Sequence, residues 1–286
     1  MTSFDVAAVT REINETVEGA FISKIYQIGT KTILLKLRKP GNPRIQLLIE
    51  AGKRLHFTSF AHETPQRPSA FCMSLRKYLD NGVIQTVKQH EFERIATIEI
   101  ATRQGVFQLI SEFFGGGNII LVDPENKILQ AMTYKRMKDR NILRAEPFQY
   151  PPARGKNPLT LSLEEFNEIK EFGETEIVRA LTKIVSISGT YAEEILLRSG
   201  INKRVHCNEL KVDEIDALFG ELQNLLSVIK SGTLEPCIVS DENQKWVDVN
   251  AVDLKKYEQF NKQKFETFNN ALDEYYAKIT DVENTK

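Results

Sequence analysis

The sequence has few of the residues from which cofactor sites and disulfide frameworks are built. Its 286 residues include three cysteines and four histidines. The cysteines are odd in number, far apart and free of any C-x-x-C spacing, so the sequence predicts a reduced, cytoplasmic protein without a zinc site or a disulfide framework. No two histidines stand at an i, i+4 spacing. We therefore interpret them as surface or half-buried residues rather than metal ligands or bases.

Long apolar runs and the common catalytic motifs are also missing. No apolar run approaches 18 residues and no basic-then-apolar leader follows Met1, so neither a membrane span nor secretion is expected. G-x-S-x-G, H-E-x-x-H and Walker sequences do not occur, and the adjacent Glu164 and Glu165 would point apart on a helix. We accordingly expect no catalytic residue, cofactor, metal or small-molecule substrate.

The balance of charge excludes a general attraction to phosphate. Because the formal net charge is -1, any nucleic-acid role has to come from a local patch. One such patch, the basic run, is a stretch rich in basic residues between positions 135 and 156, in which Asp139 and Glu146 are the only acidic residues. It predicts a phosphate-contacting surface; a solvated turn and linker is the alternative. Its members are Lys135, Arg136, Lys138, Arg140, Arg144, Arg154 and Lys156.

The first half of the chain has the pattern of an α+β fold. Apolar residues at three- and four-residue steps from Phe4 to Val17 predict a helix capped by Ser3 and ended by Gly19. Short apolar runs separated by turns predict an antiparallel meander, which a helix over 69–81 interrupts. The sequence predicts eight strands, over 20–29, 32–39, 44–52, 83–92, 94–101, 106–114, 118–123 and 128–132.

Three consecutive glycines, Gly115 to Gly117, lie between two of these strands. A phosphate loop would lead into a helix, often through a Lys and a Ser or Thr. Here a β-branched run follows, and then a turn signal over 123–126. We interpret the glycines as a bulge or hairpin turn that joins strand to strand where backbones approach closely.

The pattern changes after Tyr150, where YPPARGKNPLT predicts a linker. Helical spacing then dominates over 163–172, 176–187, 190–200 and 212–232, and Gly200 and Gly232 are expected to end the last two helices. EPCIVSD and KWVDVN predict a small hairpin.

A final helix is predicted from Leu254 onwards. Its apolar stripe has three open interpretations: core packing, a partner-binding surface, or the beginning of a coiled coil. The stripe comprises Leu254, Tyr257, Phe260, Phe265, Phe268, Leu272 and Ile279.

Glu93 and Arg94 stand at the start of a predicted strand, just after His90. Arg offers a planar fork and a stacking face, and Glu accepts hydrogen bonds from base amino groups, so the pair suits the exposed edges of unpaired bases. An ordinary surface ion pair is the alternative.

Seven stretches, taken in order, resemble the N-terminal region of the NFACT family of ribosome-associated quality-control factors, whose bacterial members were named fibronectin-binding protein A homologues. They span nearly the whole chain: FDVAAVTREI, PSAFCMSLRKYLDNG, FERIATIEI, EFFGGGNIILVD, ILRAEPFQYPP, GTYAEEILLRSGI and FNNALDEYYAK. In addition, ALTKIVSISGTYAEEILLRSGI is similar to the helix-two-turn-helix segment of formamidopyrimidine-type DNA glycosylases.

The resemblance implies a glycosylase-like, two-lobed α+β architecture. A mixed, mainly antiparallel sheet lobe is expected over 1–148 and a helical lobe with the helix-two-turn-helix motif over 149–232. A small hairpin and the start of a middle helical or coiled-coil region are expected over 233–286. Because ALDEYYAK precedes a long coiled coil in the family, the resemblance also implies that the chain is an N-terminal fragment.

The function implied by the resemblance is recognition of a large ribosomal subunit obstructed by peptidyl-tRNA. It includes tRNA binding that supports C-terminal alanine tailing of the stalled chain. The family's tRNA-binding positions match Asp5, Glu93 and Arg94, with Glu93 in place of the usual Asp. Asp5 has a second interpretation, a first-turn acid favoured by the helix dipole. The expected contacts to the RNA backbone are Lys135, Arg136, Lys138, Arg140 and Arg144.

Two other functions compete with this one. The glycosylases use a nucleophilic proline followed by Glu, where this chain has Thr2 and Ser3, and Thr190 replaces the Asn of their two-turn segment. Their paired zinc cysteines are also absent, so the sequence favours a binding protein over an enzyme. A DNA-binding or repair module of the glycosylase type is the alternative. A surface adhesin is disfavoured by the missing secretion signal.

Overall fold

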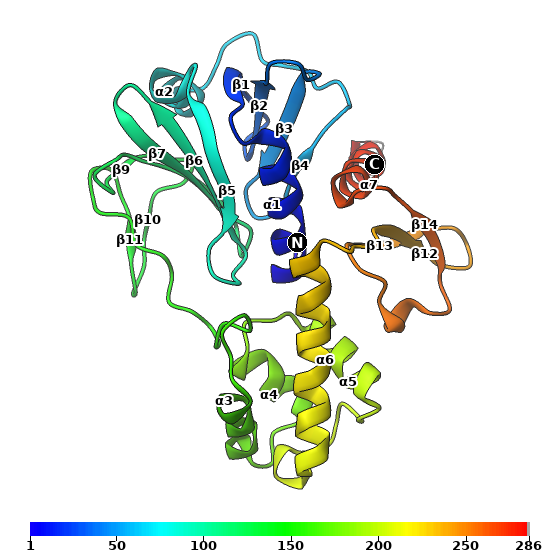
Figure 1. Ribbon diagram of the computed structural model, residues 1–286. Coiled ribbons are helices and arrows are strands. Elements are labelled where there is room, and N and C mark those ends of the chain that lie inside the picture. The colour runs from blue at the N-terminus through cyan, green and yellow to red at the C-terminus, as the bar shows by residue number, and fades with distance from the viewer. Residues whose placement is uncertain (285–286) are drawn as a thin grey trace.

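A nine-stranded antiparallel sheet forms the upper part of the molecule (Figure 1). This computed structural model describes residues 1–284 and the side chains of residues 1–280. The sheet order is β4-β3-β2-β1-β5-β6-β7-β8-β9, so two meanders stand next to each other. They are joined by one residue pair, Phe21 with Val83. The strands are β1 (Phe21–Ile28), β2 (Thr32–Arg38), β3 (Ile45–Glu50), β4 (Arg54–Phe57), β5 (Val83–Gln89), β6 (Ile95–Thr102), β7 (Gly105–Glu112), β8 (Asn118–Val122) and β9 (Ile128–Ala131).

The α+β class and the mainly antiparallel sheet are confirmed, but the prediction of eight strands missed β4. This strand pairs with β3 from Leu47↔Phe57 to Glu50↔Arg54. Its sequence, RLHF, is only four residues long, and its two polar residues, Arg54 and His56, are buried together with Leu55. So short a run, with two apolar residues, carries too little signal to be recognised as a strand.

Helix α1 (Ser3–Val17) packs against β4 and β5, one strand from each meander. Its cap is Thr2, so the predicted cap at Ser3 was wrong by one position. The Thr2 hydroxyl accepts from the Asp5 N–H at 3.1 Å, and the Asp5 carboxylate accepts from the Thr2 N–H at 2.7 Å. This reciprocal capping box requires an acid three residues after the cap, and only Thr2 has one.

The three glycines form the loop between β7 and β8, as predicted, and this loop meets the turn between β3 and β4. The N–H of Gly52 donates to the carbonyl of Glu112 at 3.0 Å. A Cβ on Gly117, where φ is +69°, would overlap the backbone of Ala51 and Gly52. The two meanders are therefore joined a second time, by turns in direct backbone contact, and the sheet is strongly curved.

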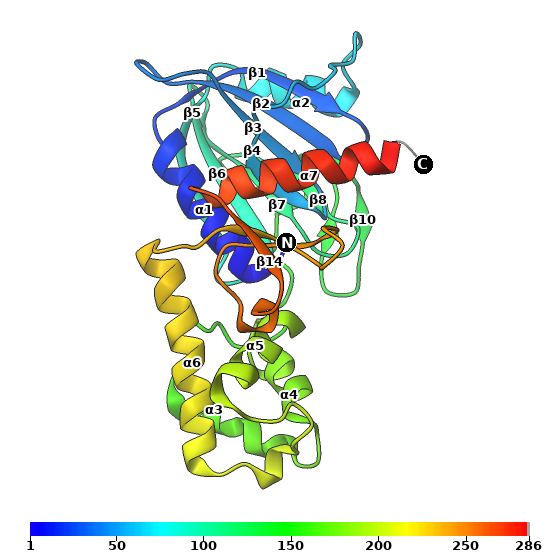
Figure 2. The same ribbon diagram turned by 90° about the vertical axis from the view of Figure 1, so that its right-hand side faces the viewer.

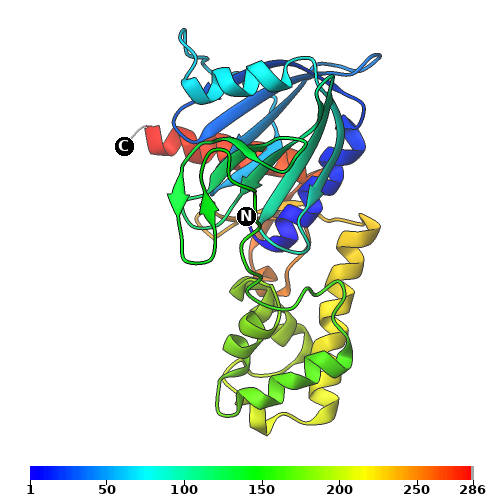
Figure 3. The same cartoon turned by 90° about the vertical axis from the view of Figure 1, so that its left-hand side faces the viewer.

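The helical part of the molecule lies below the sheet in Figures 1 and 3. As predicted, α5 and α6 end at Gly200 and Gly232, which adopt the left-handed conformation. Helix α2 lies apart, between β4 and β5 in sequence, and is capped by Ser69. The elements are α2 (Ala70–Leu79), α3 (Leu163–Asn167), the 3-10 turn η1 (Glu168–Phe172), α4 (Ile177–Ile184), α5 (Gly189–Ser199), the 3-10 turn η2 (Cys207–Glu209) and α6 (Val212–Ser231).

The predicted helix from Leu254 is wrong over its first half. The chain there forms the 3-10 turn η3 (Lys255–Tyr257) and the strand β14 (Asn261–Lys264), and only then α7 (Phe268–Asn284). β14 pairs with β12 (Cys237–Ser240), which also forms the predicted hairpin with β13 (Trp246–Asn250). Pairing with a strand more than 20 residues away overrides the local helical spacing. The apolar stripe is thus divided between η3, α7 and the segments that flank η3 and β14.

Helix α7 crosses the sheet (Figure 2) and packs against α1 and β4. The Glu12 carboxylate of α1 accepts from the N–H groups of Phe268 and Asn269 at 2.8 and 3.0 Å. Phe268 and Leu272 are buried in the main core. Core packing is therefore the correct interpretation for this part of the stripe. Within residues 1–284, no helix has the length and apolar content needed to cross a membrane.

Candidate nucleic-acid interface

Glu93 and Arg94 lie in the turn between β5 and β6, and the beginning of the linker packs onto this turn. The turn is closed by hydrogen bonds from the N–H of His90 to the carbonyl of Ile95 and from the N–H of Glu93 to the carbonyl of His90, each at 3.0 Å. The ring of Tyr150 stacks on His90 with centroids 3.5 Å apart. The linker therefore begins against the β5–β6 turn that carries Arg94.

The rest of the linker is fixed to the segment that follows α4. The N–H of Lys156 donates to the carbonyl of Ile184 at 2.8 Å, and the N–H of Ser186 donates to the carbonyl of Lys156 at 3.0 Å. Gly155 makes this approach possible, because a Cβ there would lie 2.7 Å from the carbonyl carbon of Val185. The predicted linker is thus an ordered connection that holds Arg154 in place.

Arg94 and Arg154 come close enough for their charges to interact. Burial lowers the pKa of the partly buried Arg94 guanidinium, and the charge of Arg154 lowers it further, while Glu93 acts in the opposite direction. Within the described part of the chain, neither arginine forms an ion pair or a side-chain hydrogen bond. Two neighbouring cations without a carboxylate partner favour an anion or a base edge at this position.

Glu93 is positioned by three segments that meet at this turn. Its carboxylate accepts from the Ser186 hydroxyl at 2.8 Å. The side-chain amide of Gln89 donates at 2.8 Å both to the carbonyl of Glu93 and to that of Ser3. Ser3 in turn donates its hydroxyl to the carbonyl of Ser186 at 3.2 Å. The start of α1, the β5–β6 turn and the segment after α4 are therefore joined in one hydrogen-bonded cluster.

A shallow pocket of about 370 Å³ includes Arg154 in its lining. Two further cations, Lys156 and Lys183, and two carboxylates, Glu168 and Glu171, also line it. Lys156 is paired with Glu168 at 2.6 Å, whereas Lys183 is exposed. The pocket thus carries one excess positive charge from the linker onto the helical part.

Asp5 is not brought together with Glu93 and Arg94. Its side chain is buried in the capping box of α1, and burial raises the pKa of its carboxyl group. Among the described residues, no hydrogen bond or ion pair joins it to either site residue. Asp5 is thus a first-turn acid, as in the second interpretation of the sequence, and the structure adds a capping role. Its predicted contact with a tRNA base has no geometric support.

The basic run divides into exposed and buried members. Lys135 and Arg136 form β10 (Lys135–Arg136), which pairs with β11 (Asn141–Ile142) in a hairpin, and they are exposed, as are Lys138 and Arg144. Arg140 is buried, with Nη2 2.6 Å from a carboxylate oxygen of Glu112 and Nη1 donating to the carbonyl of Gln149 at 3.0 Å. The prediction for Arg140 is therefore wrong, because a buried, paired guanidinium cannot reach a phosphate.

Sequence reasoning placed Arg154 in the basic run but did not connect it with Arg94, and it missed Ser186. Nothing local distinguishes Arg154 from the other basic residues of the run. The glycine that follows it was a usable signal, since glycine marks a close backbone approach. No local signal marks Ser186, which lies 93 residues from Glu93.

The chain is thus an α+β protein whose sheet and helical parts meet at two neighbouring arginines, Arg94 and Arg154, that have no carboxylate partner among the described residues. The chain belongs to the NFACT family: the family described as NFACT N-terminal and middle domains matches residues 2–286.

The relatives of the chain are named for ribosome quality control. The chain is similar to the archaeal Rqc2 homolog aRqcH of Methanocaldococcus jannaschii, with 33% identity over 98% of this chain and 42% of that protein. It is similar to the ribosome quality control complex subunit NEMF of Homo sapiens, with 28% identity over 97% of this chain and 28% of that protein. The chain thus spans less than half the length of these two relatives.

Among solved structures, the fold is similar to the N-terminal part of the fibronectin/fibrinogen-binding protein from Streptococcus suis. The TM-score is 0.75 at 26% identity, covering 97% of this chain and 99% of that chain. The resemblance seen in the sequence is therefore confirmed, both for the family and for its bacterial members' older name.

Proposed function

We propose that this chain is the tRNA-binding N-terminal part of a cytoplasmic ribosome quality-control factor. It recognises a large ribosomal subunit that still carries peptidyl-tRNA and holds a tRNA that supports C-terminal alanine tailing of the stalled chain. Family membership and the names of the relatives support the ribosomal setting. The observation that carries the tRNA contact is the pair Arg94 and Arg154, which lacks a carboxylate partner among the described residues.

In this proposal the residues of the β5–β6 turn read bases and the surrounding cations hold phosphates. Arg94 stacks on, or donates to, unstacked bases of a tRNA loop, and Glu93, oriented by Ser186, accepts from a base edge. Arg154 binds the adjacent phosphate. Asp5 acts indirectly, by fixing the start of α1. The exposed cations of the β10–β11 hairpin make further phosphate contacts: Lys135, Arg136, Lys138 and Arg144.

The division of the chain belongs to the same proposal. Residues 1–148 form the sheet lobe and residues 149–232 the helical lobe, in which α4 and α5 are the two helices of the helix-two-turn-helix motif. Residues 233–286 form the third segment, of which the last two lie outside the described residues. The candidate interface is then the place where the first two lobes meet.

The test is crosslinking of the full-length protein to RNA in cells, followed by sequencing, for the wild type and for Arg94→Ala and Arg154→Ala. Each substitution is expected to reduce the tRNA signal about tenfold, which is the usual cost of removing a base- or phosphate-binding arginine. Arg103→Ala is the matched control. Arg103 is exposed, as Arg154 is, and lies beyond the other end of β6, roughly 30 Å from Arg94 along the strand.

The outcomes separate the function from the site. A wild-type protein that crosslinks to no tRNA would contradict the proposed function. A tRNA signal that falls equally in Arg94→Ala and Arg103→Ala would contradict the site but not the function.

The glycosylase alternative makes a separate prediction. The N–H of Thr2, at the position of the glycosylases' nucleophilic proline, donates to the Asp5 carboxylate within the helix cap. We expect no strand cleavage when the purified protein is incubated with lesion-containing duplex DNA. Cleavage that exceeds a blank preparation would favour the alternative.

A further inference from the structure

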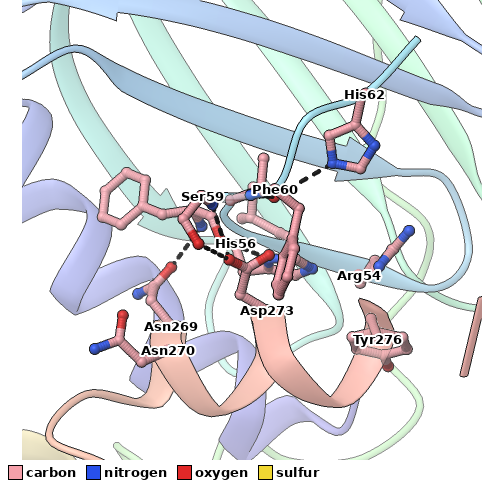
Figure 4. A network of polar contacts seen from close by, with 12 residues as sticks. Arg54, His56, Ser59, Phe60, His62, Asn269, Asn270, Asp273 and Tyr276 are labelled. Atoms are coloured by element: carbon pink, nitrogen blue, oxygen red, sulfur yellow. Dashed lines mark hydrogen bonds and ion pairs between the residues drawn. The ribbon is translucent and has the colours of Figure 1, made fainter. Parts of the chain in front are cut away.

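A second pocket, separate from the β5–β6 turn, lies where α7 crosses the end of the sheet. Its volume is about 450 Å³, within the range of pockets that bind small organic groups. The walls are formed by β2, β3 and β4, by the loop after β4, and by α7 (Figure 4). The side chains used below include Glu50, Arg54, His56, Phe60, His62 and Asp273.

The loop after β4 is fixed to α7 by Asp273. One oxygen of the Asp273 carboxylate accepts from the N–H and the hydroxyl of Ser59, at 2.8 and 3.0 Å (Figure 4). The next residue, Phe60, lines the pocket and is 40% exposed. An aromatic ring is thereby held at the pocket by an anchored backbone, although its burial contributes little to the core.

His56 lines the pocket and carries a buried hydrogen-bond acceptor without a partner among the described residues. Its side chain is 1% exposed, and Nδ1 lies 2.7 Å from the carbonyl of Phe57. A carbonyl only accepts, so Nδ1 carries the hydrogen. Burial lowers the pKa of His56 to about 4, so the ring is neutral at pH 7 and Nε2 is an acceptor. Nε2 has no hydrogen-bond partner within the described residues, which is rare for a buried polar atom.

The charged groups around His56 already have partners or oppose each other. Arg54 donates to Glu50 at 2.6 Å and its guanidinium lies over the ring of Tyr276. Asp273 has its second oxygen 3.8 Å from Nδ1 of His56, and burial lowers the pKa of His62 as well. Lys53 also lines the pocket, with Nζ 3.8 Å from Glu50, so the two carboxylates of the wall face two cations. The wall therefore has acceptors and a balanced charge, which favours a neutral group with N–H donors over a free anion.

We propose that this pocket binds one unpaired RNA base that carries an amino group. The amino group donates to Nε2 of His56, and the face of the base stacks on Phe60. Stacking on an exposed aromatic ring and hydrogen bonding along a base edge are the two ways in which proteins hold unpaired bases. The inference rests on the proposed function and deepens it, since it adds a second base-binding site on the sheet side of α7.

The test compares two ligands that differ in one group. AMP and purine riboside 5′-monophosphate, which is AMP without the amino group, are titrated into the purified chain labelled with 15N-histidine. AMP is expected to bind about tenfold more tightly or better, because the analogue leaves the buried acceptor unpaired, and to shift the Nε2 resonance of His56. Equal binding of the two ligands, or binding without that shift, would overturn the inference.

Variants locate the site without relying on a core substitution. Phe60→Ala is expected to weaken AMP binding about tenfold, the usual effect of losing one stacking contact. Phe21→Ala, at a similarly exposed ring (36%) on β1, is expected to leave it unchanged. His56→Phe, checked for folding by circular dichroism, is expected to abolish the preference for AMP over its analogue. A Phe60→Ala variant that binds AMP as the wild type does would overturn the inference.

Failure of this inference is distinguishable from failure of the proposed function. Arg94→Ala is expected to leave AMP binding intact, because the β5–β6 turn is not part of this pocket. If tRNA crosslinking depends on Arg94 but AMP does not bind, the pocket inference alone fails. If AMP binds as described but no tRNA crosslinks in cells, the pocket stands as a nucleotide site and the proposed function fails.

Discussion

Replacing Gly117 by alanine is expected to destabilise the protein by about 4 kcal/mol or more, at the extreme of single substitutions. Two costs add. Gly117 has φ +69°, a conformation that costs an L-residue roughly 1–2 kcal/mol. The new Cβ would also overlap the backbone of Ala51 and Gly52, which cannot move aside by changing a rotamer. The measurement is the free energy of unfolding from urea titration of the two proteins.

Gly115→Ala is the matched control for this experiment. Gly115 belongs to the same loop and also has a positive φ, +56°, but a Cβ there meets no atom within 4 Å. It is expected to lose only the conformational cost, roughly 1–2 kcal/mol. Equal losses at the two positions would mean that the contact with the β3–β4 turn does not limit the size of residue 117.

The second large effect is expected at the buried ion pair of Arg140 and Glu112. Arg140→Ala leaves the Glu112 carboxylate buried without its partner, which costs about 3–5 kcal/mol. Arg136→Ala, at an exposed position of the same hairpin, is expected to change the free energy of unfolding by less than about 0.5 kcal/mol. A loss of similar size at Arg136 would contradict the distinction between buried and exposed members of the basic run.

The pH dependence of the Arg140→Ala variant provides an independent check. Burial raises the pKa of Glu112 above its ordinary 4.5 even with Arg140 present, and removing the arginine raises it further. A carboxyl group with a raised pKa binds more protons when folded than when unfolded, so stability falls as the pH rises through the window above 4.5. The deficit of the variant relative to wild type is therefore expected to shrink as the pH is lowered from about 8 towards 5.

Local chemistry predicted the elements whose residues carry their own signals. The left-handed glycines after α5 and α6 marked the helix ends, and the longer apolar strands were recognised, including the fully buried β8. β4 and β14 were missed for different reasons. β4 is only four residues long and two of them are polar, whereas β14 has the polar sequence NKQK and exists because β12 pairs with it. Neither strand has a local pattern strong enough to predict it.

The candidate site was predictable only in part, for a related reason. Glu93 and Arg94 are adjacent in sequence, so a local pattern found them. Arg154 reaches Arg94 because the linker is bonded to the segment after α4, and Ser186 reaches Glu93 through the same docking. In the sequence, Arg140 cannot be distinguished from its basic neighbours. In the structure it forms an ion pair with Glu112, which is far from it in sequence. Long-range packing decides which cations remain available.

The cap that Glu12 provides for α7 also sets the order in which the protein can fold as it is made. The two partners are 256 residues apart, and at about 5–20 residues per second a ribosome needs roughly 13–50 s to travel between them. During that interval α1 and β4 have emerged while the helix that covers them has not been synthesised. A chain that we propose to act on interrupted translation can therefore close its own core only after its own translation has passed α7.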